Sequence, residues 1–218
     1  MNSLETSAHR LQRIGGIAGI LSIVFYFSVA VFSFLPDAIA LSLAFSFPLL
    51  WIIAFMGLYH FLKEERHTAS LEIGYIFGII GGALACTLLV VQQANIIWHE
   101  QAMAEAASEE AQALLKATFR GANRVQAGMD VAFDIFITVS WFLYAINVAR
   151  SSYFPRLLGW TGCLLTIGLL TLNMITFPTA PAEAGLFDLG PFLGIWTLVL
   201  FIWLLVLLSK KGRTSEES

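Results

Sequence analysis

The chain has 218 residues and a net charge of −3; 58% of its residues are hydrophobic and only 12% are charged. A soluble domain carries about 25% charged residues, and a chain of this length cannot bury so much apolar surface in a core of its own. The composition therefore excludes a soluble globular protein, and the lack of a basic block excludes a nucleic-acid-binding surface.

Six apolar runs follow one another along the chain, each long enough to cross a hydrocarbon layer of about 30 Å as a helix. They are residues 14–35, 38–62, 71–98, 127–149, 157–177 and 189–208. The first run is too long for the apolar part of a signal peptide, and no small-residue cleavage site follows it. Because helices satisfy their own backbone polar groups in lipid, the sequence predicts an all-α integral membrane bundle of six transmembrane helices.

Lys and Arg are distributed unevenly between the two ends of these runs. They flank the first and last runs and lie in the connections after the second and fourth, at Arg10, Arg13, Lys63, Arg66, Arg150, Arg156, Lys210, Lys211 and Arg213. The positive-inside rule then predicts a multi-pass protein of the cell inner (plasma) membrane with both termini cytoplasmic. The expected division is a cytoplasmic segment 1–13, a transmembrane domain 14–209 and a cytoplasmic tail 210–218.

The longest connection, residues 99–126, is predicted to contain a short amphipathic outer helix between the third and fourth transmembrane helices. Ser108 is a suitable N-cap, with Glu109 and Glu110 in the first turn, and Gly121 suits the C′ position. Apolar residues recur within it at helical spacing. We expect this helix to be a lid or connector packed on the bundle; the alternative is a helix that binds a partner.

Small residues recur every fourth position on the third apolar run, at Gly74, Gly78 and Gly82. Such a ridge lets another helix approach closely in a membrane. Packing within one bundle is the simpler interpretation. The alternative is a homodimer, or contact with a partner in a membrane complex, through the same three glycines.

Polar side chains that are expensive in hydrocarbon gather in the outer half of three helices. Two aspartates lie four residues apart on the fourth run and so share a helix face, and three polar residues share a face of the third run at i, i+3 and i+7. The candidate residues for binding a ligand or a proton are Asp130, Asp134, His99, Asn95, Gln92 and Asn173.

Three interpretations of this group remain open. Asp130 and Asp134 lie at the headgroup boundary and pair with Arg124 or Lys116; or they line an outward-facing polar cavity for a small polar or cationic ligand or a proton. In the second case two carboxylates one turn apart favour the neutral form of at least one. The third interpretation is catalysis, with an aspartate as general base and His99 as its partner, or a metal site formed by His99 and both aspartates.

Cofactor motifs are lacking in the sequence. No Cys-x-x-Cys or His-x-x-x-His pair predicts a metal site, and Cys86 and Cys163 fall inside apolar runs, which does not indicate a disulfide scaffold. His60 and His99 are expected at opposite membrane faces, so they do not form an axial pair for a haem. We expect no cofactor.

Two short segments resemble a known family. Residues 153–159 have the sequence YFPRLLG, and residues 13–19 have the sequence RIGGIAG. The first is similar to the Phe-x-Pro-Arg or Leu-Pro-Arg-x-Leu-Gly segment, and the second to the Arg-x-Ala-Gly start, of bacterial membrane proteins catalogued as domain of unknown function 4386. The resemblance implies a six-helix bacterial inner-membrane protein and supplies no activity.

The sequence thus favours binding or translocation of a small polar or cationic ligand, or a proton, over catalysis. The alternatives are a non-catalytic accessory subunit of a larger membrane complex, and an intramembrane enzyme using Asp130, Asp134 and His99.

Overall fold

The computed structural model describes the backbone of residues 3–32 and 34–216 and the side chains of residues 8–32 and 34–210. This part of the chain forms six α-helices and contains no β-strand. The helices are α1 (Ser3–Val31), α2 (Asp37–Glu65), α3 (Ala69–Glu105), α4 (Glu109–Arg150), α5 (Arg156–Thr176) and α6 (Gly190–Glu216). The predicted all-α fold is confirmed.

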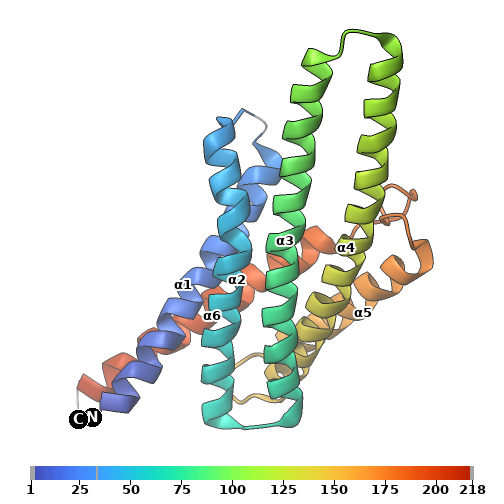
Figure 1. Ribbon diagram of the computed structural model, residues 1–218. Coiled ribbons are helices and arrows are strands. Elements are labelled where there is room, and N and C mark those ends of the chain that lie inside the picture. The colour runs from blue at the N-terminus through green and yellow to red at the C-terminus, as the bar shows by residue number, and fades with distance from the viewer. Residues whose placement is uncertain (1–2, 33, 217–218) are drawn as a thin grey trace.

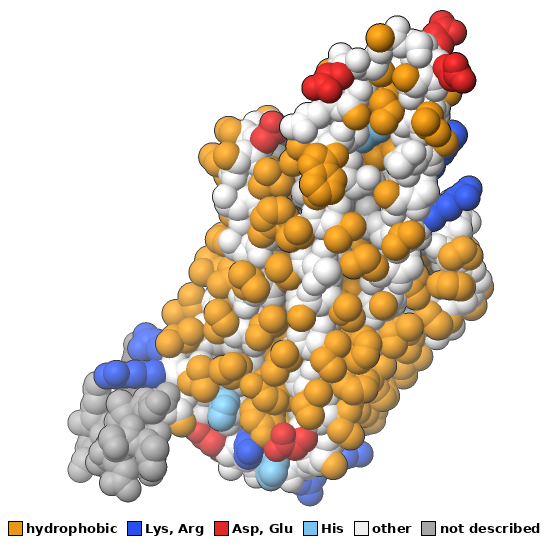
Figure 2. All heavy atoms as spheres, in the orientation of Figure 1, with side chains coloured by type: hydrophobic (Ala, Val, Ile, Leu, Met, Phe, Trp, Pro, Cys, Tyr) orange, Lys and Arg blue, Asp and Glu red, His pale blue; other side chains and the backbone are white. Residues whose placement is uncertain are grey.

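All six helices are long and apolar enough to cross a membrane. The shortest, α5, has 21 residues and is about 32 Å long at 1.5 Å per residue. Hydrophobic side chains cover the middle of the face shown in Figure 2, whereas charged side chains gather near its two ends. On α5, Leu157 and Leu164 are each 74% exposed. Such a surface suits lipid rather than water, so the chain is a multi-pass membrane protein.

The helices pack as a closed ring. Each helix contacts its neighbours in the sequence, and α1 also contacts α6. The connections α1–α2, α3–α4 and α5–α6 lie at one end of the bundle, here called the hairpin end (Figure 1). The other two connections lie with the start of α1 and the end of α6 at the opposite end, here called the terminal end. A ring of six helices encloses an interior that the helices separate from lipid.

Glycines set the closest contacts between helices. A Cβ atom on Gly15 of α1 would lie 2.5 Å from the Cα atom of Gly57 on α2, and one on Gly159 of α5 would lie 2.3 Å from the backbone nitrogen of Ala149 on α4. Carbon atoms in contact are about 3.5–4.0 Å apart, so only glycine permits these approaches. Small residues allow membrane helices to gain van der Waals contact in this way.

The predicted glycine ridge of α3 faces helices of the same chain. A Cβ atom on Gly74 would meet Leu143 of α4, whereas one on Gly78 or Gly82 would meet Phe55 or Ile52 of α2. All three glycines are buried. The ridge therefore serves packing within the bundle, and its use by a second copy or another partner stays a prediction.

Side-chain hydrogen bonds join the connections at the terminal end. Glu65, at the end of α2, accepts hydrogen bonds from the Ser151 hydroxyl and, at 2.6 Å, from the backbone N–H of Ser152. The hydroxyl of Thr68, the N-cap of α3, donates to Oδ1 of Asn147 on α4 at 2.8 Å. These contacts fasten the α2–α3 connection to α4 and to the α4–α5 connection.

Replacing Glu65 tests how much this fastening contributes. Glu65→Ala removes two hydrogen bonds to a charged acceptor in a partly exposed setting, and we expect it to lower the free energy of unfolding by about 1–2 kcal/mol. The measurement is thermal unfolding of the detergent-solubilised protein. Glu100→Ala, at an exposed position on α3, is the matched control. Equal melting temperatures for the two variants would contradict a stabilising role for Glu65.

The predicted short outer helix is wrong, because α4 runs without a break from Glu109 to Arg150. Its predicted start is right, since Ser108 is the N-cap and accepts a hydrogen bond from the Ala111 N–H at 3.2 Å. Gly121 does not end the helix, because α4 keeps contact with α3 along this stretch, for example between Asn123 and Asn95. α3 and α4 thus form a helical hairpin that projects beyond the other helices (Figure 1).

Candidate ligand cavity

A cavity of about 330 Å³ lies inside the ring, and every helix contributes to its wall. Its residues on α3 are Ala85, Leu88, Leu89 and Gln92, and those on α4 include Asp130, Phe133, Asp134 and Ile137. Both sets follow the spacing i, i+3, i+4 and i+7, so each helix presents one face to the cavity. The α5–α6 connection contributes residues 180–182 and Asp188 on the side of the hairpin end.

One side of the cavity is acidic. Asp130 and Asp134 come from α4, and Asp188 comes from the α5–α6 connection, where its Oδ1 atom also accepts a hydrogen bond from the Gly190 N–H at 2.8 Å. No Lys or Arg is among the described residues that line the cavity. Among the described side chains, none of these three carboxylates forms an ion pair.

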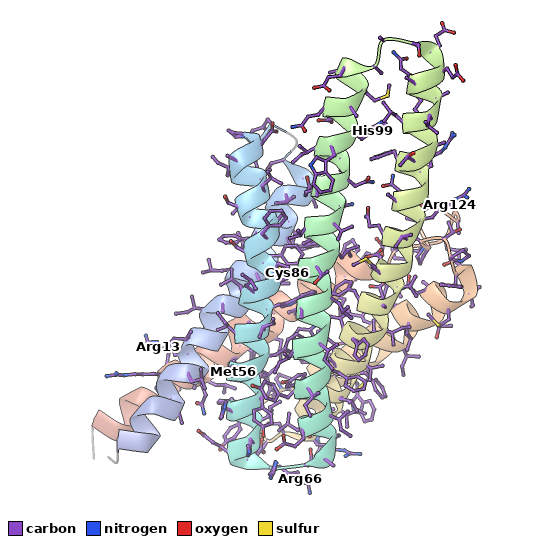
Figure 3. The ribbon with its side chains drawn as sticks, viewed as in Figure 1. Arg13, Met56, Arg66, Cys86, His99 and Arg124 are labelled. Carbon is purple, nitrogen blue, oxygen red and sulfur yellow. The ribbon has the colours of Figure 1, made fainter. Side chains whose placement is uncertain are left out.

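The two basic residues predicted as partners of the aspartates lie elsewhere. Arg124 is exposed and projects from α4 on the side away from α3 (Figure 3). Lys116 is also exposed, more than three helical turns before Asp130. Neither is ion-paired with Asp130 or Asp134 in the described part of the chain, so neither of the two predicted partners neutralises these carboxyl groups.

Another side of the cavity is aromatic. Tyr26 of α1 contacts Phe47 of α2 with ring centroids 5.5 Å apart, Phe47 contacts Trp51 at 6.0 Å, and Trp51 contacts Phe133 of α4 at 6.1 Å. All four residues line the cavity. Trp51 also contacts Trp141 at 6.5 Å, two turns further along α4 than Asp134. The row of rings therefore leads from the hairpin end toward the closed interior.

Asn173 joins the acidic side from α5. It is 5% exposed, lines the cavity and lies near the Asp134 carboxylate. Its amide nitrogen has no hydrogen bond of normal geometry among the described residues. Asn173 and Asp134 thus place an amide and a carboxyl group near each other in the cavity wall.

The structure brings four of the six candidate residues together and leaves two apart. Asp130, Asp134, Gln92 and Asn173 line the same cavity. Asn95 instead donates a hydrogen bond to Asn123 at 2.8 Å, and His99 stacks on Phe119 with ring centroids 4.2 Å apart. Both lie between α3 and α4 in the projecting hairpin, where Figure 3 labels His99.

The separation of His99 from the aspartates bears on the catalytic and metal-binding interpretations. His99 is not among the residues that line the cavity. In the part of the chain that the structure describes, no group of three or more His, Cys, Asp or Glu side chains is close enough to hold one metal ion. The constellation that those two interpretations need is therefore not assembled in this conformation.

Sequence reasoning missed Asp188, Gln126 and the aromatic row. Gln126 lies four residues before Asp130, so helical spacing alone suggests that it shares the face of the aspartates. Asp188 lies two residues before Gly190 and accepts a hydrogen bond from its N–H, a local pattern typical of an Asx-turn. The aromatic residues carry no such signal, because every apolar run of this chain contains aromatic residues.

Comparisons with known proteins agree with the fold and add no activity. No curated protein and no solved structure matches the chain. One family model matches residues 37–207, which include α2 to α5, most of α6 and all of the cavity except its α1 side. With most of its length matched, the chain belongs to the family described as domain of unknown function DUF4386.

Proposed function

We propose that the protein binds a small cation in the cavity, which the ligand enters from the hairpin end. The observation that carries the proposal is that Asp130 and Asp134 share a cavity wall to which no Lys or Arg of the described side chains contributes. Ionisable residues within a membrane bundle are costly, and they mark ligand and ion sites when they face its interior. A bound cation would supply the missing positive charge.

The distribution of basic residues supports an orientation of the protein in the membrane, and this orientation gives the side from which the ligand enters. Arg66 lies in a connection at the terminal end, and Lys63, Arg150 and Arg156 lie in the helix ends next to these connections. The α1–α2 and α5–α6 connections contain neither Lys nor Arg. The positive-inside rule supports a cytoplasmic terminal end and termini. The hairpin end then faces outward from the inner membrane of a bacterium.

Translocation would require a second conformation. Trp51 contacts Phe55 and Trp141 at the inner side of the cavity, and these two partners are fully buried. Passage of a ligand to the terminal end would have to separate these rings and the hydrogen-bonded connections beyond them. Binding from the outer side is therefore the function that the geometry supports best, with translocation as a further step.

Neutralising one carboxylate tests the proposal. Asp134→Asn keeps the shape of the side chain and removes its charge, so we expect the affinity for tetramethylammonium to fall by about tenfold or more, which corresponds to about 1.4 kcal/mol. The measurement is equilibrium binding of radiolabelled tetramethylammonium to the purified full chain. Asp130→Asn is expected to weaken binding in the same direction.

The control is Glu100→Gln, which removes one negative charge from the hairpin at a position outside the cavity. It should bind the probe as the unaltered protein does, because an exposed charge beyond a Debye length of about 10 Å is screened. Unchanged binding in both aspartate variants would refute the proposal.

A further inference from the structure

We infer that the cation this cavity accepts is organic, an ammonium group attached to an aromatic or other apolar body, rather than a proton or an inorganic ion. The inference rests on the proposed function and concerns the same cavity. It is carried by three features: the size of the cavity, the arrangement of its carboxylates and the row of rings along its wall.

The volume is the first feature. At about 330 Å³ the cavity falls at the lower end of the range of about 300–1,000 Å³ that holds small organic ligands. A bare inorganic cation fills only a small part of such a space. The remaining wall is largely apolar, with Leu88, Leu169 and Leu193 among its residues. Water would have to fill the rest of the cavity, and such a wall gives it few hydrogen-bond partners.

The arrangement of the carboxylates is the second feature. Hard cations such as Ca²⁺ take six to eight oxygen ligands, and Mg²⁺ demands near-ideal octahedral geometry. Asp130, Asp134 and Asp188 line one cavity, yet they do not converge into a group that would hold one metal ion within the described residues. Separated carboxylates suit a larger cation that spreads its charge over several atoms.

The aromatic row is the third feature. The faces of Trp, Tyr and Phe attract ammonium groups, and recognition of quaternary ammonium ligands by aromatic side chains is a common use of this attraction. Phe133 directly precedes Asp134 on α4, and Trp51 contacts Phe133 from α2. A cation held by the aspartates therefore lies next to rings, and its apolar body can extend inward along Trp51.

The test compares probes that differ only in the body attached to the charge. Tetramethylammonium, benzyltrimethylammonium and sodium are titrated into the purified full chain by calorimetry. We expect benzyltrimethylammonium to bind about tenfold more tightly than tetramethylammonium because of its ring, and sodium to bind more weakly than both.

Variants of the wall assign the preference to the rings. Trp51→Leu should reduce the preference for the benzyl compound to about threefold or less, while tetramethylammonium still binds. Phe133→Leu is measured in parallel and should reduce the preference in the same way; it decides the question alone if Trp51→Leu does not elute as a folded protein. Trp160→Leu is the matched control, since Trp160 is 63% exposed and outside the cavity; it should keep the full preference.

The outcomes separate this inference from the proposed function. Two results would overturn the preference for an organic cation with an apolar body: equal affinity for the two ammonium probes, or tighter binding of sodium than of both. If this binding is lost in Asp134→Asn, the proposal of cation binding itself still stands. A ring preference that survives both Trp51→Leu and Phe133→Leu also overturns it. Absence of binding by all three cations, or binding insensitive to both aspartate variants, refutes cation binding and this inference with it.

The ammonium group can belong to a soluble amine or to a lipid headgroup. The two sources are distinguished in nanodiscs of phosphatidylglycerol alone and of phosphatidylglycerol with phosphatidylethanolamine. Weaker binding of benzyltrimethylammonium in the second membrane identifies the lipid amine as a competitor for the cavity. Equal binding in both identifies a soluble amine as the occupant, and each result supports the organic class.

Discussion

Gly159→Ala is expected to destabilise the bundle by about 3 kcal/mol, near the upper limit for overpacked positions. The added Cβ atom would lie 2.3 Å from the backbone nitrogen and 2.4 Å from the Cα atom of Ala149. Both of these atoms belong to the backbone of α4, so no side-chain rotation relieves the clash. α5 has to move away from α4, and the van der Waals contact along their crossing is lost.

The chain offers matched controls for this substitution. Gly121 and Gly128 lie within α4, and a Cβ atom at either position would meet nothing within 4 Å. Because Ala favours the helix over Gly by about 1 kcal/mol, Gly121→Ala and Gly128→Ala should leave stability unchanged or raise it slightly. Unfolding of the three variants in mixed micelles provides the comparison, and a Gly159→Ala protein as stable as the controls would show that the crossing is not tight.

Trp141→Ala is expected to cost about 3 kcal/mol, at the lower end of the range for large aromatic residues in protein cores. Trp141 is fully buried and contacts Phe55 at 4.5 Å, Trp196 at 5.6 Å and Trp51 at 6.5 Å between ring centroids. In a bilayer the unfolded chain stays in an apolar medium, so the hydrophobic transfer contribution is small. The cost arises from the contacts that the emptied space no longer makes.

The same substitution should also weaken ligand binding, because Trp51 rests on Trp141 at the inner side of the cavity. Trp160→Ala removes an equally large side chain that is 63% exposed, and its effect on stability should stay within about 0.5 kcal/mol. Thermal unfolding of the two purified variants measures the difference. Similar melting temperatures would mean that the ring contacts of Trp141 do not stabilise the bundle.

The six spans were predictable because an apolar run of about 20 residues with at most two charged residues has few other stable states. The projecting hairpin of α3 and α4 was not predictable from the sequence. Gly121 lies at the end of an amphipathic stretch and follows two basic residues, a pattern that predicts a helix end. Only the structure shows that α3 continues alongside α4 there, with Asn95 bound to Asn123 and His99 stacked on Phe119. Tertiary contact thus outweighs a local stop signal.

Polar residues at helical spacing in the apolar runs include several that the structure places in the wall of one cavity. Asp130 and Asp134 are four apart, and Gln92 lies at the corresponding depth of α3, so all three line the same cavity. His99 shares the face of Gln92 but lies seven residues further on, about 10 Å along the axis. If all six helices had the same length, His99 would still lie at the opening of the cavity. Because α3 and α4 project, it falls in the hairpin instead.

The contribution of all six helices to one cavity has a consequence for the life of the protein in the cell. Whatever occupies the cavity stabilises the entire bundle by mass action, by about 2.7 kcal/mol at a concentration one hundred times its dissociation constant. Empty chains are then the ones that quality-control proteases remove first. We therefore expect cellular abundance to rise and fall with the supply of the natural occupant, so that growth conditions which increase the steady-state level of the protein without increasing its transcript also enrich its ligand.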